Sequence, residues 1–274
     1  MKHAVFSGFK YTTLVVGSIV TLLPLVTIFL ASFKTGRELA DTGPFALPSE
    51  WTFDNYVTAW TDGKMLQGFL NTGIILIVAI TGTVIIGAMT AFAIDRFDFR
   101  GRKIVLGAFL LAVLVPAVTT QVATFQVVNA LGLYNTRWAA IVLFLGTDII
   151  SIYIFLQVIR AIPKELDEAA RLEGAGNLRI FWQVIFPLLK PAIATVVIIK
   201  GFAAYNEFYI PFLYMPSSDL GTVSTSLFRF SSGPLGAQWQ IVAAGVVIAI
   251  IPTVIIFLSM QRYIYAGMTQ GATK

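Results

Sequence analysis

Long apolar segments separated by shorter polar ones set the pattern of this chain. A helix needs about 20 mostly apolar residues to cross a bilayer. The segments that satisfy this are residues 11–33, 68–94, 104–128, 138–159, 192–215 and 240–261. The pattern therefore predicts an all-α integral membrane protein, with residues 1–274 forming a single domain of six transmembrane helices. We expect the first segment to be a retained anchor, because its apolar run exceeds the roughly 7–15 residues of a signal peptide.

Charged residues are few and unevenly placed along the chain. They make up 12% of it, about half the share found in soluble domains. With the N-terminus inside, thirteen of the nineteen Lys and Arg residues fall on the cytoplasmic side, which agrees with the positive-inside rule. Both termini are then cytoplasmic, together with the polar segment 161–191 and the tail 262–274. This topology explains the net charge of +5, so membrane lipid is the expected partner and nucleic acid is not.

The composition also excludes several kinds of chemistry. Cysteine is absent and His3 is the sole histidine. We therefore predict no disulfide, no thiol nucleophile, no metal site and no catalytic residue paired with a histidine base. No G-x-x-x-x-G-K-[ST] motif occurs, so the chain has no phosphate-binding loop for ATP and is not predicted to be an enzyme.

Ala161–Pro191 is the longest polar island between two apolar segments. It predicts a surface helix over residues 163–173, which Gly174 and Gly176 should stop or bend. A more apolar helix should follow over residues 179–189. The apolar face expected on the first helix consists of Leu166, Ala169, Ala170 and Leu172. Such an elbow is suited to docking a partner, and the alternative is an amphipathic loop that rests on lipid headgroups.

Several polar side chains fall inside predicted spans. Asp148 lies roughly 15 Å deep in the fourth span, at a rise of 1.5 Å per residue, and Lys200 lies near the middle of the fifth. Glu207 lies two turns beyond Lys200 on the same helical face. Intramembrane ionisable residues usually face a cavity or a partner, so they indicate a transport pathway. The pathway candidates are Lys200, Tyr205, Asn206, Glu207, Asp148 and Gln121. Interhelical hydrogen bonding remains an alternative for all of them.

A D-x-x-D pair, Asp95 and Asp98, follows the second span. Two carboxylates at this spacing are compatible with a metal site. However, Arg96, Arg100 and Arg102 are interleaved with them and would repel a cation. We therefore interpret these residues as solvated charges that fix the topology.

The polar island resembles the EAA loop of ABC-importer permeases. The resemblance rests on Glu168-Ala169-Ala170, Gly174-Ala175 and Ile185-Phe186-Pro187 at the spacing of that motif. Glu173 stands where sugar-importer permeases usually have Asp, and the charge is kept. In that family the loop is a coupling helix that docks on a cytoplasmic ATPase subunit. The residues to which the resemblance gives this role are Glu168, Ala169, Ala170, Arg171, Glu173, Gly174 and Ala175.

Two other segments resemble carbohydrate permeases of the same family. Residues 202–208 match an F-x-x-W-N-E-F segment, with Tyr205 in place of Trp. The C-terminal residues are similar to a tail that lies along the ATPase dimer interface, which implicates Gly267, Thr269 and Gly271. Thr273 replaces an apolar residue of that tail.

The resemblance implies a type I ABC-importer permease in a bacterial inner (cytoplasmic) membrane, moving a sugar or sugar-like solute. It also implies a second homologous permease, an ATPase dimer that binds ATP and Mg²⁺, and an extracytoplasmic solute-binding protein. No cofactor is expected on this chain itself. The external loop 216–239 is the expected surface for the binding protein.

Two other functions compete with this reading. An ion-coupled secondary transporter would use Asp148, Lys200 and Glu207 as a proton relay. A membrane-embedded enzyme would need a catalytic cluster, for which residues 95–98 are the sole candidate.

Overall fold

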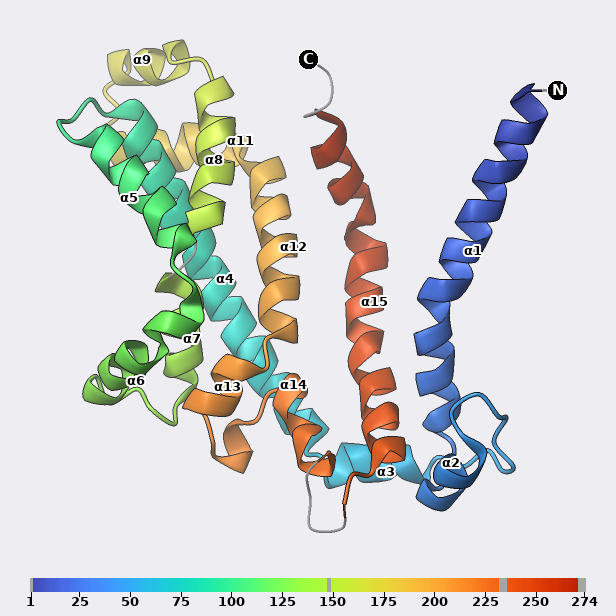
Figure 1. Ribbon diagram of the computed structural model, residues 1–274. Coiled ribbons are helices and arrows are strands. Elements are labelled where there is room, and N and C mark those ends of the chain that lie inside the picture. Colours follow the sequence, from blue (N-terminus) through green and yellow to red (C-terminus); the bar gives the residue numbers. More distant parts are fainter. Residues whose placement is uncertain (1, 147–148, 232–235, 271–274) are drawn as a thin grey trace. The chain divides into compact units, whose positions relative to one another are not determined.

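The structure is a computed structural model that describes residues 2–146, 149–231 and 236–270 (Figure 1). As predicted, the fold is all-α. Its α-helices are α1 (Lys2–Ala31), α2 (Gly36–Thr42), α3 (Asp54–Thr61), α4 (Met65–Arg96), α5 (Arg102–Leu114), α6 (Gln121–Ala130), α7 (Arg137–Gly146), α8 (Ile149–Ala161), α9 (Glu165–Leu172), α10 (Asn177–Ile180), α11 (Phe186–Leu188), α12 (Lys190–Asn206), α13 (Tyr209–Tyr214), α14 (Val223–Ser226) and α15 (Trp239–Gln270). The 3₁₀ turns are η1 (Ala117–Thr120), η3 (Ser218–Leu220) and η4 (Phe228–Phe230), and η2 (Phe181–Ile185) is π-helical.

Three helices in the described part of the chain are long and apolar enough to cross a membrane on their own. They are Phe9–Ala31 in α1, Met65–Arg96 and Trp239–Ser259 in α15. Three bent helix pairs bring the number to six if each pair forms one span. The pairs are Arg102–Leu114 with Val118–Ala130, Arg137–Gly146 with Ile149–Ala161, and Asn177–Leu188 with Lys190–Asn206.

The expected span over residues 104–128 is broken at Pro116. Its two helices meet at 91°. Val115 is extended (φ −77°, ψ 115°), because the ring of a following proline disfavours the helical region for the residue before it. The chain then resumes through η1 into α6. The expected span over residues 192–215 is also interrupted, because α12 ends at Asn206 and α13 begins at Tyr209.

The chain divides into two compact units. The first contains Met1–Leu66 and Thr225–Ile255, and the second contains Gln67–Ser224 and Ile256–Lys274. In the first unit, Phe33 packs against Phe29, Trp51, Phe53 and Tyr56, with ring centroids 5.0–5.5 Å apart. This aromatic cluster fixes the segment that follows α1.

Lys34 is fully buried beside the aromatic cluster. Its Nζ atom donates to the carbonyl of Gly43 at 2.7 Å and to Thr42 Oγ1 at 3.2 Å. The amide of Asn55 donates to the carbonyls of Ser32 and Lys34. A buried ammonium group is tolerated when such acceptors replace its water, so these bonds fix the fold of residues 32–55.

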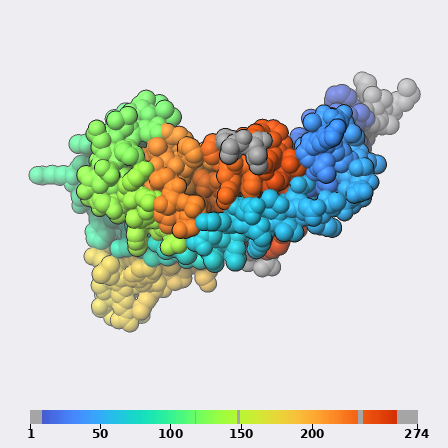
Figure 2. Space-filling view, turned by 90° about the horizontal axis from the view of Figure 1, so that it is seen from below, coloured from blue at the N-terminus to red at the C-terminus, as the bar shows by residue number. Residues whose placement is uncertain are grey.

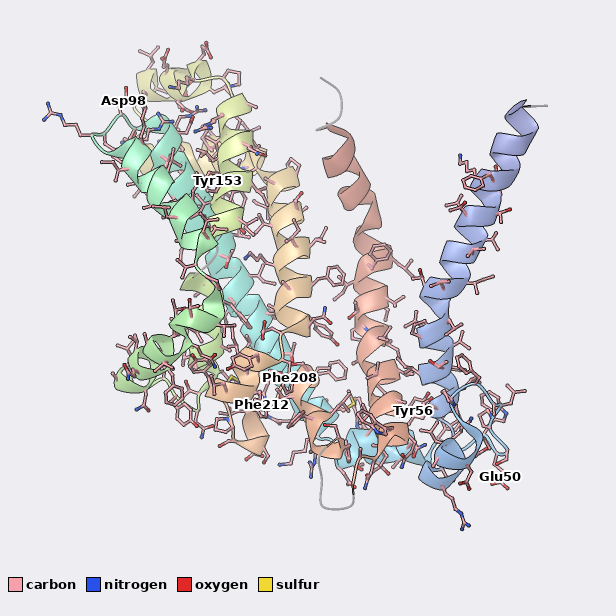
Figure 3. The ribbon with its side chains drawn as sticks, in the orientation of Figure 1. Glu50, Tyr56, Asp98, Tyr153, Phe208 and Phe212 are labelled. Atoms are coloured by element: carbon pink, nitrogen blue, oxygen red, sulfur yellow. The ribbon has the colours of Figure 1, made fainter. Side chains whose placement is uncertain are left out.

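The core of the second unit lies between α4, α8, α12 and the segment from α10 to η2. Its fully buried side chains include Phe155, Ile159, Ile180, Ile185 and Val196. In addition, the hydroxyl of Tyr153 on α8 donates to the carbonyl of Leu106 on α5 (Figure 3). Figure 1 shows α9 at one end of this unit and α13 at the other. Thus the core holds together the two ends that carry candidate functional residues.

Candidate functional site

The EAA-like segment forms the predicted elbow. Its first helix, α9, begins with acidic residues in the first turn, which suits the positive end of the helix dipole. It is terminated by Gly174, whose φ of +83° is left-handed. The amide of Gly174 donates to Arg171 O and that of Ala175 to Ala170 O, both at 2.9 Å. This is the Schellman pattern, which needs a residue that tolerates positive φ at the glycine position.

Most of the EAA-like residues point away from the core. Glu168, Ala169, Arg171, Glu173 and Gly174 are exposed. Ala170 and Ala175 are half-buried and pack on the core cluster. In Figure 2 the segment around these residues, in yellow, projects beyond the other helices of its unit. The motif is therefore exposed on its outer side, and Ala170 and Ala175 hold it against the core.

Large apolar side chains are exposed on the same elbow. Leu172 is 91% exposed, and Leu166 and Leu178 are exposed as well. Exposed apolar side chains grouped on one surface indicate an interaction site. The apolar face predicted for this helix is therefore not its buried face. The one fully buried residue of α9 is Asp167, which sequence reasoning did not single out.

A buried ionic cluster lies beneath α9. Arg96 is the last residue of α4, and its Nε atom lies 2.6 Å from Asp167 Oδ2. Its Nη1 atom lies 2.7 Å from Asp95 Oδ2, and its Nη2 atom donates to the carbonyl of Ile162 at 2.9 Å. The side chains of Arg96 and Asp167 are each 3% exposed. The end of α4 is thereby joined to α9 and to the turn that precedes it.

Two further arginines complete the cluster around Asp95. Arg102 Nη2 lies 3.4 Å and Arg160 Nε 3.7 Å from Asp95 Oδ1. The prediction that Asp95 is a solvated charge is therefore wrong, because its side chain is only 8% exposed. A buried carboxylate persists where paired guanidinium groups compensate its lost hydration. Asp98, by contrast, is exposed as predicted (Figure 3).

A cavity of about 200 Å³ lies between α4, α7, α12 and α13 in the second unit. It brings together Lys200 on α12 and Glu207, which lies just beyond the end of that helix, with Thr83 and Phe144 on neighbouring helices. The remaining lining is apolar, from three alanines and three larger aliphatic residues: Ala79, Ala203, Ala204, Ile80, Leu143 and Ile210. The cavity therefore combines two charged residues with a mainly apolar wall.

The Glu207 carboxylate also has a structural role. Its Oε1 atom accepts hydrogen bonds from the amides of Tyr209 at 2.7 Å and Ile210 at 3.2 Å. It thereby caps the first turn of α13, where Phe208 and Phe212 stack with ring centroids 5.1 Å apart (Figure 3). The residue that lines the cavity therefore also stabilises the start of α13 after the break from α12.

The other pathway candidates are placed differently. Gln121 lines a neighbouring cavity of about 180 Å³ with Thr120, Thr124 and Tyr209. Asn206 donates to the carbonyl of Phe202 within its own helix, and Tyr205 is half-buried. Asp148 and Gly271 lie outside the described residues. Gly267 and Thr269 fall in the last turns of α15.

The first part of the external loop is anchored to α4, which sequence reasoning missed. The amide of Asn71 donates to the carbonyls of Asp219 at 2.9 Å and Gly221 at 2.8 Å. The Thr72 hydroxyl accepts from the Val223 amide at 3.0 Å. A polar Gln-x-x-x-Asn-Thr sequence at the start of an apolar span was the available signal.

Comparison with known proteins places these features in a family. The model of the family described as "binding-protein-dependent transport system inner membrane component" matches residues 3–270. The galactooligosaccharides transport system permease protein of Bacillus subtilis is 32% identical over 97% of this chain and 95% of its own. The diacetylchitobiose uptake system permease protein of Streptomyces coelicolor is 28% identical over 97% of this chain and 88% of its own.

A solved structure shares the fold. A chain of a bacterial ABC transporter involved in the import of the polysaccharide alginate superimposes with a TM-score of 0.84. The two chains are 21% identical, and the match covers 96% of this chain and 98% of the other. The family match spans nearly the whole sequence. The chain belongs to the family of inner membrane components of binding-protein-dependent transport systems.

Proposed function

We propose that this chain is one permease subunit of a carbohydrate-type ABC importer, in which the α9 elbow couples the membrane helices to an ATPase. The observation that carries the proposal is the outward presentation of the EAA-like residues, with Leu172 91% exposed beside them. A leucine this exposed, flanked by the charged residues Arg171 and Glu173, is suited to binding in a cleft of another protein. Relatives named as oligosaccharide permeases support the substrate class.

The mechanism follows from the two ends of the second unit. Closure of an ATPase dimer on ATP and Mg²⁺ would push on α9 at one end. The core of α4, α8 and α12 would carry this displacement toward the Lys200–Glu207 cavity. The helices would then alternate between inward- and outward-open arrangements around a site within the membrane. The partner subunits would hydrolyse ATP, and this chain would contribute part of the path that the solute takes across the membrane.

The size of the cavities supports a second permease. Cavities of about 200 and 180 Å³ are smaller than the roughly 300–1,000 Å³ of sites that enclose a drug-sized ligand. An oligosaccharide would need surface from a homologous partner as well. An extracytoplasmic binding protein would deliver it, with loop 216–239 as the expected docking surface in the inner membrane complex.

The test is transport by the whole importer with α9 altered. Glu168→Lys reverses an exposed charge, and Gly174→Pro imposes a φ near −65° where the native value is +83°. Both variants are expected to assemble with the ATPase and to lose uptake. Arg37→Gln, in a solvent-exposed ion pair of α2, is the matched control and should transport normally. Normal uptake by both α9 variants would contradict the coupling role, and ATP-independent uptake by the chain alone would favour an ion-coupled transporter.

A further inference from the structure

We propose that Arg96 is the positioning residue for α9: it holds this helix at the end of α4 through the buried Asp167 carboxylate. The inference rests on the proposed coupling role of α9. It assigns the contact through which a displacement of α9 reaches the first long helix of the second unit.

The geometry of the guanidinium group supports this role. Each of its three nitrogens lies close to a different partner: Nε forms an ion pair with Asp167 Oδ2 without hydrogen-bond geometry, Nη1 donates to Asp95 Oδ2, and Nη2 donates to the carbonyl of Ile162. Ile162 precedes α9 and Asp167 lies within it. A planar, always charged fork can fix all three at once, which a lysine ammonium on a flexible stem cannot do. Arg96 therefore determines both the position and the rotation of α9.

Within α9, apolar packing on the core is limited to the half-buried Ala170. The helix has eight residues, a length that is not stable in isolation. Its large apolar side chains, Leu166 and Leu172, are exposed, and Asp167 is its one buried residue. The ion pair is thus the principal contact that distinguishes one orientation of α9 from another.

The surrounding charges make the contact specific. Asp95 would compete with Asp167 for Arg96, but it is also shared by Arg102 on α5 and Arg160 on α8. The cluster therefore joins the ends of four helices, with Asp167 as the contribution of α9. Within the described part of the chain, Asp167 Oδ1 accepts no hydrogen bond. The contact with Arg96 is made by the other carboxylate oxygen, Oδ2.

The experiment uses the assembled importer in proteoliposomes and measures uptake and ATP hydrolysis in the same sample. Arg96→Gln and Asp167→Asn are each expected to retain hydrolysis and to lower the solute moved per ATP about tenfold, within the usual range for residues that carry coupling. The double variant should be no worse than either single one, because contacting residues are non-additive. Arg100→Gln and Glu165→Gln make the same charge changes at exposed positions and should leave the ratio unchanged.

A second readout follows α9 directly. The chain has no cysteine, so a spin label at Leu172→Cys, attached before assembly with the partner subunits, modifies this chain on α9 alone. Arg96→Gln should increase label mobility, whereas Arg100→Gln should not. If the neutral variants do not assemble, Arg96→Lys keeps the charge and serves instead. It should assemble and still show the lower ratio and the more mobile label.

The outcomes separate this inference from the proposed function. Loss of uptake in Glu168→Lys, with normal coupling and label mobility in Arg96→Gln, Asp167→Asn and Arg96→Lys, would overturn the positioning role alone. Normal uptake in Glu168→Lys and Gly174→Pro would overturn the coupling role of α9 itself. Additive losses in the double variant would show that Arg96 and Asp167 act independently, and would also overturn the inference.

Discussion

Arg137 at the start of α7 donates a 2.8 Å hydrogen bond from Nε to Oδ1 of Asn71, a fully buried residue of α4. The amide nitrogen of Asn71 in turn donates to Asp219 O and Gly221 O. One asparagine therefore joins α4, α7 and the loop that precedes α14. Since these segments lie 66 to 150 residues apart in the sequence, the contact fixes the tertiary arrangement at this end of the second unit.

Replacing this asparagine should destabilise the second unit. Asn71→Ala leaves an arginine N–H and two carbonyl groups without their buried partner, which costs about 1–3 kcal/mol. Thermal unfolding of the purified protein in detergent measures the loss. Asn129→Ala, at an exposed position of α6, is the control. Equal midpoints for the two variants would show that the Asn71 contacts do not contribute to stability.

The two glycines of the elbow should respond differently to alanine. Gly174 has a φ of +83° and Gly176 a φ of −75°, and a Cβ atom meets no neighbour at either position. Gly174→Ala therefore costs roughly 1–2 kcal/mol of local strain, which corresponds to about tenfold faster hydrogen exchange at the Ala175 amide. Gly176→Ala should leave that exchange rate unchanged. Identical rates in both variants would mean that the left-handed turn does not terminate α9.

Glu207 should affect both transport and the α12–α13 break. Glu207→Gln keeps an oxygen that can accept from Tyr209 and Ile210, but it removes the charge beside Lys200 in the cavity. We expect an unchanged thermal midpoint and a raised KM for uptake. Glu207→Ala also removes the cap and should lose about 1 kcal/mol of stability. If KM in Glu207→Gln matches that of the control Asp41→Asn, the carboxylate acts as a cap alone.

The loop after α1 should respond to acid through Glu38. Its Oε1 atom accepts a 2.6 Å hydrogen bond from the Ser49 amide, and this bond holds the pKa of Glu38 below its usual value. A lowered pKa in the folded state stabilises the loop above the pKa of the unfolded chain, and this gain is lost as the pH falls through the folded value. The protection of the Ser49 amide, measured as its exchange rate relative to an unfolded chain at the same pH, should therefore fall in acid. Glu38→Gln should remove that pH dependence, and an unaltered profile would contradict the assignment.

Local features of the fold could be predicted from local sequence. The apolar segments predicted the long helices and Gly174 predicted the end of α9. Pro116 is the local signal for the break before α6, where a continuous span was expected. Each follows from the backbone or hydropathy of a few neighbouring residues. Three of the six predicted segments overlap single long helices and two overlap bent pairs. The third bent pair differs from the prediction, because it joins Asn177–Leu188, from the segment expected to be cytoplasmic, to Lys190–Asn206.

Features that depend on tertiary packing could not be predicted in this way. The alternating charges near Asp95 look solvated until α8 and α9 fold back over them with Arg160 and Asp167. Similarly, the sequence of α9 does not indicate that Asp167 is its buried residue, because the guanidinium group of Arg96 that pairs with it lies at the end of α4. In both cases the residue that forms the ion pair is remote in sequence, so a local sequence pattern cannot predict the contact.

The most direct test of the central claim is a cross-link from α9 in the assembled importer. A thiol-directed photo-cross-linker at Leu172→Cys modifies this cysteine-free chain at one position. The account predicts a cross-linked product with the ATPase subunit, whose yield changes on addition of ATP and Mg²⁺. A cross-linker at Leu110→Cys, on an exposed apolar position of α5, should give no such product. Cross-linking of Leu172→Cys to lipid alone, in a complex that still transports, would contradict the coupling role of α9.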